Sequence, residues 1–148
     1  MKKVIIIIIC LGFISCGNNK TEIIQLSNLT KIYHFQNEKV EYFVVANPPQ
    51  NSDTLLNLLS SHFQVFAPND TIEKYYYYSH FYFKETRFTP RDYKEEWKGY
   101  FNHDYIDNHY TDLLIRIMIK PEFNRQTIYF YKKGKIEQKI ETKWKSLK

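Results

Sequence analysis

The N-terminal apolar stretch is the feature that most constrains where and how this chain can fold. Lys2 and Lys3 precede an apolar region of eleven residues, Val4–Ile14, and the polar segment Gly17–Lys20 follows it. A positive start, a short apolar core and small residues at its end are typical of a secretory signal. Eleven residues are too few for a bilayer-spanning helix, which needs about 20. We therefore predict that residues 1–15 are a signal peptide and that the remaining chain folds in the cell envelope.

Cys16 lies where the apolar region meets the polar one. The segment Phe13–Cys16 resembles the lipobox of bacterial lipoproteins, although that family prefers leucine where Phe13 stands. The resemblance covers only this N-terminal part. It implies that the Cys16 thiol carries a diacylglyceryl group, that cleavage occurs before Cys16, and that the new amine is acylated. Gly17 in second position resembles sorting to the outer membrane. Ordinary secretory cleavage after Gly17 is the alternative.

A lipidated cysteine implies a strong membrane anchor. Each buried methylene contributes about 0.8 kcal/mol, and two or more acyl chains hold a protein firmly. The expected partners are the membrane, through this lipid, and an envelope protein, with no nucleic acid. Residues 16–30 begin with a polar Gly-Asn-Asn sequence and have no clean period, which favours a lipidated tether. We expect a single globular domain over residues 31–148, in the periplasm or at the cell surface.

Composition limits what can stabilise the mature chain. Removal of residues 1–15 leaves 133 of the 148 residues, enough for one domain with a hydrophobic core. Cys10 leaves with the signal and Cys16 becomes the lipid site, so no disulfide is available. The formal charge of +5 falls to +3 without Lys2 and Lys3, which is too weak to indicate nucleic-acid binding.

Hydrophobic periodicity predicts the first elements of the domain. Residues 39–46 are β-branched and aromatic and predict a strand, and leucines at helical spacing predict a helix over about 53–64. Asn51, Ser52 and Asp53 supply the helix N-cap chemistry. A turn is expected at 68–70. Residues 72–86 form a β-prone run longer than an ordinary strand, and we expect a bend near Ser79 and His80.

The second half predicts a short helix and three strands. Pro90 at a first helical position and Gly99 beyond the last favour a helix over 90–98. Alternation over 113–119 places Leu113, Ile115, Ile117 and Ile119 on one face. Residues 127–132 and 135–142 predict a hairpin around Lys133 and Gly134, with Ile136 and Ile140 facing inward. The predicted fold class is α+β, with a mostly antiparallel sheet of about five strands and one or two helices on a face.

An aromatic segment is the first candidate for a binding site. Tyr75, Tyr76, Tyr77 and Tyr78, with Phe81 further on, place aromatic rings on both faces of one strand. Either the helices cover the second face or that face meets a partner, because large exposed apolar patches usually mark an interaction site.

A polar loop is the second candidate. His103 and Asp104 begin a cluster of possible ligands that continues to His109. Nothing in their spacing forces the side chains to converge in the tetrahedron that zinc requires. We therefore predict no metal site and no cofactor, and treat His103 and Asp104 as weak binding candidates in the loop 101–109.

Three functions follow from these observations, in decreasing order of support. The first is a membrane-anchored envelope lipoprotein with a non-enzymatic binding or accessory domain. The second is an inhibitor or immunity protein tethered at the envelope. The third is an envelope enzyme, which is disfavoured because no set of residues has a spacing typical of catalysis.

Overall fold

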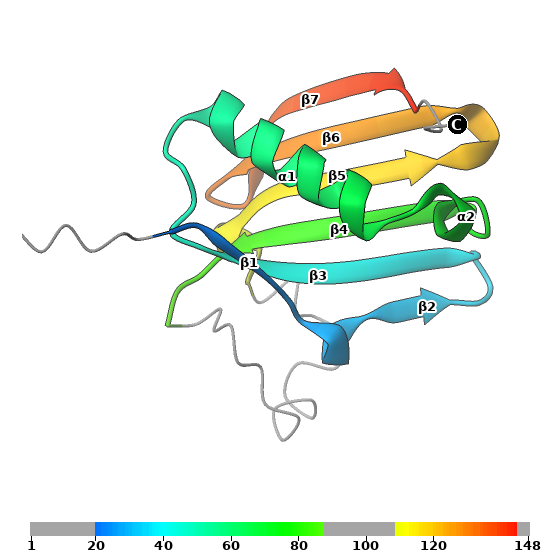
Figure 1. The fold of residues 1–148 in the computed structure, drawn as a ribbon, viewed down its shortest axis with the longest axis horizontal. Helices are drawn as coiled ribbons and strands as arrows, with labels where there is room; N and C mark the ends of the chain where they lie inside the picture. The colour runs from blue at the N-terminus through cyan, green and yellow to red at the C-terminus, as the bar shows by residue number, and fades with distance from the viewer. Residues whose placement is uncertain (1–19, 88–108, 145–148) are drawn as a thin grey trace, which may run out of the picture.

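The computed structural model describes residues 20–87 and 109–144, which form a seven-stranded sheet with helices on one face (Figure 1). The elements in chain order are β1 (Glu22–Gln25), η1 (Ser27–Leu29), β2 (Lys31–Tyr33), β3 (Glu38–Ala46), α1 (Ser52–Phe66), α2 (Asn69–Ile72), β4 (Tyr77–Lys84), η3 (Tyr110–Asp112), β5 (Leu113–Lys120), η4 (Pro121–Phe123), β6 (Arg125–Lys132) and β7 (Lys135–Lys143).

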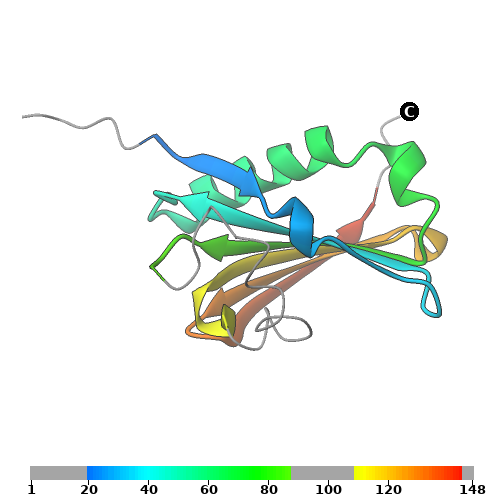
Figure 2. The same ribbon diagram turned by 90° about the horizontal axis from the view of Figure 1, so that it is seen from below.

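The strand order is β1-β3-β4-β5-β6-β7, and β2 pairs with β3 at the same edge as β1. Only β3 and β4 are parallel, because α1 and α2 connect them as a crossover. Both helices lie on one side of the sheet (Figure 2). The α+β class and the mostly antiparallel sheet are therefore confirmed, but the sheet has seven strands rather than five.

The two additional strands lie at the start of the chain that the structure describes. β1 pairs antiparallel with the end of β3, and β2 pairs with its beginning. Leu26, just before η1, and Leu29, its last residue, are buried. The predicted tether over 16–30 is thus wrong in its second half: residues from Glu22 onward belong to the domain. The sequence concealed this because β1 has only four residues, too few to establish a period.

Helix α1 forms as its sequence predicts. The Asn51 side chain accepts a hydrogen bond of 2.9 Å from the Thr54 backbone N–H, which satisfies one of the free donors at the helix start. Leu59 and Phe63 are buried against the sheet, and Leu55 and Leu56 pack around them. The helix extends two residues beyond the predicted end, to Phe66.

Strand β4 is shorter and straighter than predicted. The β-prone run starts in α2, where Ile72 is buried, and the strand begins only at Tyr77. Ser79 and His80 lie within the continuous strand, so the predicted bend there is wrong. The strand continues because β3 and β5 hydrogen-bond to it on both sides through these residues.

Two β-bulges in the sheet turn Leu113 and Ile136 to the face opposite to the one predicted. A register shift between Tyr82 and Phe83 places Leu113 against Phe83, in the cluster on the face opposite α1. Its predicted neighbour Ile115 lies under the helix instead. A second shift, after Phe130 on β6, pairs Tyr131 with Ile136, so Ile136 is exposed rather than inward-facing. Each bulge inserts one residue, and one residue inverts the alternation.

The hydrophobic core has two parts. The larger lies between the helices and the sheet and includes Phe43, Leu59 and Ile117. The smaller lies on the opposite face and includes Tyr42, Val44 and Phe81. Among the described residues, none of the helices is long and apolar enough to cross a membrane. The predicted helix over 90–98 lies outside the described residues.

Candidate functional site

The two ends of the sheet differ in character. The distal end is defined here as residues 32–37, 74–77 and 120–125, where β3 and β4 begin and β5 ends. The proximal end is defined as residues 20–22, 46–51, 84–87, 110–113 and 131–137, where β1 begins and β3 and β4 end. In Figure 1 the distal end lies on the right, beside α2, and the proximal end on the left.

Exposed apolar side chains concentrate at the distal end. Seven large hydrophobic residues among those described are exposed, and four of them lie there: Ile32, Tyr33, Phe35 and Phe123. Phe35, in the β2–β3 turn, is fully exposed, and the side chain of Phe123 is 54% exposed. The exposed surface of such an aromatic ring can be buried against a partner.

The tyrosine segment contributes to this end, but not by simple alternation. Tyr75 packs with the larger core and Tyr78 is buried in it. Tyr76 and Tyr77 stay half-buried at the surface, with their ring centroids 4.5 Å apart. Because Tyr75 and Tyr76 precede the strand, the division is 75 and 78 against 76 and 77, rather than odd against even.

Ring contacts join Tyr76, Tyr77 and Phe123 at the distal end, to which Tyr33 and Phe35 also belong. The rings of Tyr76 and Phe123 lie 6.1 Å apart at their centroids, edge to face. The Lys120 Nζ lies 4.5 Å from the centre of the Tyr77 ring, a cation–π contact. We call Tyr33, Phe35, Tyr76, Tyr77 and Phe123 the distal aromatic cluster.

Asn37 holds the β2–β3 turn against the start of β4. Its carbonyl accepts a 2.7 Å hydrogen bond from the Tyr76 N–H, and its side-chain amide donates a 3.1 Å bond to the Lys74 carbonyl. Asn37 has a φ of 47°, in the left-handed region that asparagine tolerates better than most residues. Asn37 therefore fixes the β2–β3 turn, which carries Phe35, against the segment that leads into β4.

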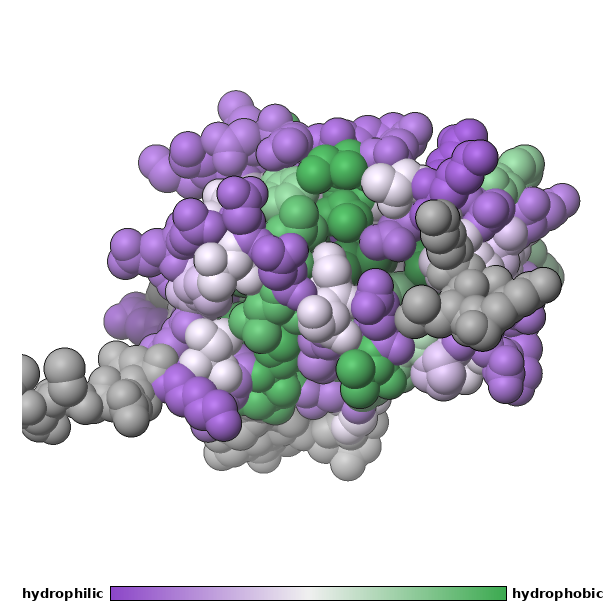
Figure 3. Space-filling view, turned by 45° about the horizontal axis from the view of Figure 1, so that its top comes forward, coloured by the Kyte–Doolittle hydropathy of each residue, from purple (hydrophilic) through white to green (hydrophobic). Residues whose placement is uncertain are grey.

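Two hollows open near the same end. One, of about 280 Å³, lies between the end of α1, α2 and the last strands, and it is lined by Phe63, Ala67, Asn69, Ile72, Gln126 and Trp144 among others. The other, of about 270 Å³, is shallow and adjoins Phe123, Arg125 and Glu141. Elsewhere on the helix-bearing side, hydrophobic side chains gather in separate patches among hydrophilic ones (Figure 3). The distal end thus offers aromatic, amide and cationic groups for non-covalent recognition.

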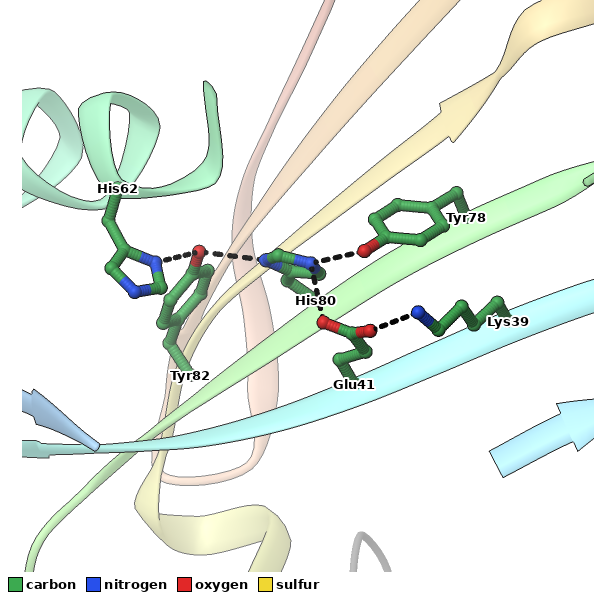
Figure 4. A network of polar contacts seen from close by, with 6 residues as sticks. All are labelled: Lys39, Glu41, His62, Tyr78, His80 and Tyr82. Carbon is green, nitrogen blue, oxygen red and sulfur yellow. Dashed lines mark hydrogen bonds and ion pairs between the residues drawn. The ribbon is translucent and has the colours of Figure 1, made fainter. Parts of the chain in front are cut away.

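A second group of polar side chains lies buried beneath α1 (Figure 4). His80 Nδ1 lies 3.1 Å from the Tyr82 hydroxyl, which also lies 3.1 Å from His62 Nδ1 on the helix. The other ring nitrogen of His80 lies 3.2 Å from the Tyr78 hydroxyl and 3.3 Å from a carboxylate oxygen of Glu41. Lys39 forms a 2.5 Å ion pair with the second oxygen of Glu41.

Burial determines how these groups ionise. Burial lowers the pKa of His80. Burial, followed by the repulsion of His80, lowers the pKa of His62 to about 4. Burial alone would raise the pKa of Glu41, but hydrogen bonding to His80 and Lys39 outweighs it and leaves that pKa below its ordinary value. At neutral pH the network therefore holds two neutral imidazoles and one carboxylate paired with Lys39.

The centre of this network is closed to a substrate, whereas His62 and Lys39 at its ends are partly exposed. The side chains of His80 and Tyr82 are fully buried, and Phe43 and Phe63 pack on His80 with ring centroids 4.7 and 4.5 Å away. Its geometry links α1 to the sheet, so we assign it a structural role. Local patterns in the sequence do not predict this network, because its residues come from three elements. The available signal was Glu41, a charged residue on the same strand face as Phe43 and Val45.

Most of the remaining site residues predicted from the sequence cannot be placed in the fold. Cys16, His103 and Asp104 lie outside the described residues. His109, the last member of the predicted polar loop, is buried, and burial lowers its pKa. Over residues 20–87 and 109–144, no group of three or more histidine, cysteine, aspartate or glutamate side chains could hold a metal ion.

No family model, no curated protein and no solved structure matches this chain.

Proposed function

We propose that this protein is a lipid-anchored, non-enzymatic binding module of the cell envelope, and that the distal aromatic cluster binds an envelope protein. One observation carries the proposal. Three of the four exposed aromatic rings among the described residues, Tyr33, Phe35 and Phe123, lie at the distal end, whereas β1, the first described strand, begins at the opposite end. The domain would then present its recognition surface away from the membrane that anchors it.

The chemistry of the cluster suits a protein partner. Phenylalanine and tyrosine bury large areas with few rotatable bonds, and such residues dominate the binding energy of protein interfaces. Phe35 and Phe123 contribute little to the stability of the domain because much of their surface stays in water. Lys120, held over Tyr77, adds a cation at the rim of the cluster.

The length of the tether supports this orientation. Glu22 is six positions after Cys16, so the first residue of β1 lies at most about 20 Å from the lipidated cysteine. β3 has nine residues and spans about 30 Å along the sheet. The distal aromatic cluster would therefore stand roughly 30–50 Å from the anchor, within reach of proteins in the same membrane.

Substitution of the exposed rings tests the binding proposal. We expect Phe35→Ser and Phe123→Ser to leave thermal unfolding almost unchanged and to abolish cross-linking to an envelope protein in cells. Val65→Ser is the matched control, because Val65 is an exposed apolar residue on α1 outside the cluster. Loss of cross-linking with Val65→Ser alone, or an unchanged set of cross-linked proteins in all three variants, would contradict the proposal. A toxin or lytic enzyme as the cross-linked partner would indicate an inhibitor or immunity protein.

A separate experiment tests the anchor. Cys16→Ala should yield a precursor that is uncleaved or cut elsewhere and that incorporates no labelled fatty acid. The natural chain should incorporate the label. Equal incorporation into both would contradict lipidation at Cys16.

A further inference from the structure

The β6–β7 turn at the proximal end has a composition suited to a membrane surface. Resting on the proposed lipid anchor, we infer that this turn and its neighbours lie on the anionic lipid surface that carries the anchor. We call Tyr110, Lys132, Lys133, Lys135 and Ile136 the proximal tip. This contact fixes the orientation of the domain and is separate from the distal aromatic cluster.

The strand registers place the proximal tip beside the entry of the chain. Glu22 pairs with Ala46, and Lys84 on the next strand pairs with Val45. Leu113 pairs with Phe83 at the same end, and the Lys132–Lys135 pair closes the β6–β7 hairpin there. In Figure 1 the start of β1 and this hairpin turn lie on the same side of the molecule.

Two of the three lysines of the proximal tip have no ion-pair partner among the described residues. Lys132 forms a 3.1 Å ion pair with Glu137. Lys133 and Lys135 are exposed, and neither forms an ion pair with any described residue. A lysine near an anionic leaflet is attracted to it by about 1 kcal/mol, so two such lysines bias the orientation of a protein that is already anchored nearby.

Apolar side chains accompany these cations. Ile136 is 56% exposed and Tyr110 is 49% exposed. Within 20–87 and 109–144, they are the exposed large hydrophobic residues of the proximal end. A tyrosine has an apolar body and a polar tip, which suits the boundary between acyl chains and headgroups. Cationic and apolar groups together are typical of surfaces that lie on a membrane.

The proximal tip is also rigid. Lys133 and Gly134 have φ values of 50° and 77°, the pair of positive angles that a tight two-residue hairpin turn requires. Tyr110 packs directly on Gly134, where a side chain would overlap the tyrosine ring. The lysines and Ile136 therefore project from an ordered turn, so contact with lipid costs little backbone conformational entropy.

Two contacts at opposite edges of the sheet would hold the strands upright on the membrane. β1 and β7 are at opposite ends of the strand order, five strand spacings apart, which corresponds to roughly 24 Å across the sheet. The tether reaches about 20 Å, so the anchor and the proximal tip can touch the same surface. The distal aromatic cluster then points away from the lipid.

The test uses the full-length chain, matured in bacterial cells and reconstituted into vesicles of phosphatidylethanolamine and phosphatidylglycerol. Acetylation of each lysine, followed by mass spectrometry, reports its accessibility. We expect Lys133 and Lys135 to be acetylated at least about fivefold more slowly than in vesicles of phosphatidylcholine alone. Lys74, exposed at the distal end, should react equally in both vesicles.

A matched pair of variants separates the proximal tip from general effects. Ile136→Ser should reduce the protection of Lys133 and Lys135, whereas Phe123→Ser, at a residue of similar exposure, should leave it unchanged. Fatty acid on Cys16 is measured in the same preparation. A lipidated protein in which Lys133 shows no more protection than Lys74 overturns this inference alone. A protein without the lipid overturns the proposed anchor, and this inference with it.

Discussion

At the residue scale, Gly134 leaves no room for an added side chain. Gly134→Ala should cost about 1–3 kcal/mol, because it combines a positive φ with an overlap against the Tyr110 ring. Urea unfolding measures this loss. Tyr110→Ala should remove the overlap but not the backbone strain, so the double variant should lose less than the sum of the two single variants. Strict additivity of the two losses would contradict the contact.

His62 provides a pH-dependent prediction at the same scale. Its pKa in the folded state, about 4, lies below the ordinary value of 6.5. As the pH falls from 6.5 towards 4, the unfolded chain takes up a proton that the folded protein excludes, so stability is full above this window and declines within it. Glu41, His80 and His109 have lowered pKa values too and contribute in the same direction.

His62→Gln tests this contribution because glutamine does not titrate and can still reach the Tyr82 hydroxyl. The free energy of unfolding should fall between pH 7 and pH 4.5 in both proteins. The fall should be smaller in the variant by about 1 kcal/mol, a value reduced for the partial exposure of the ring. An equal fall in both proteins would show that His62 is not held neutral.

At the scale of elements, β1 and η1 are the part of the fold whose contribution is least evident from the sequence. Leu26→Ala should cost about 2–4 kcal/mol, because the side chain is buried in the cluster opposite α1. Ser27→Ala, at the exposed neighbouring position, should change the unfolding free energy by less than about 0.5 kcal/mol. If residues 22–30 were only a tether, both changes would be silent in thermal unfolding.

At the scale of the whole molecule, we expect packing to stabilise the domain without a disulfide or a metal. The sequence holds two cysteines, Cys10 and Cys16, both before the described residues. We expect the midpoint of thermal unfolding to be the same with and without reductant and chelator. A marked loss with chelator would indicate a metal, and the loop that includes His103 and Asp104 would be the first place to look. The distal aromatic cluster and the proximal tip lie at opposite ends of the sheet. Substitutions in one should therefore leave the contact proposed for the other unchanged.

The sequence by itself determined the elements whose signals are local. The Asn51 cap and the leucine spacing specify α1, and the Lys133–Gly134 turn specifies the β6–β7 hairpin, because capping and tight turns involve residues a few positions apart. It also marked Cys16 as the candidate anchor.

Only the tertiary structure decided the features that depend on distant partners. β1 is a strand because the end of β3, about twenty residues later, pairs with it. The bulges that redirect Leu113 and Ile136 exist only as mismatches between two strands, so no periodicity within one strand reveals them. The distal aromatic cluster and the His80 network likewise join residues from several elements. Hydrophobic pattern sets which residues avoid water, but register and crossover set which of them meet.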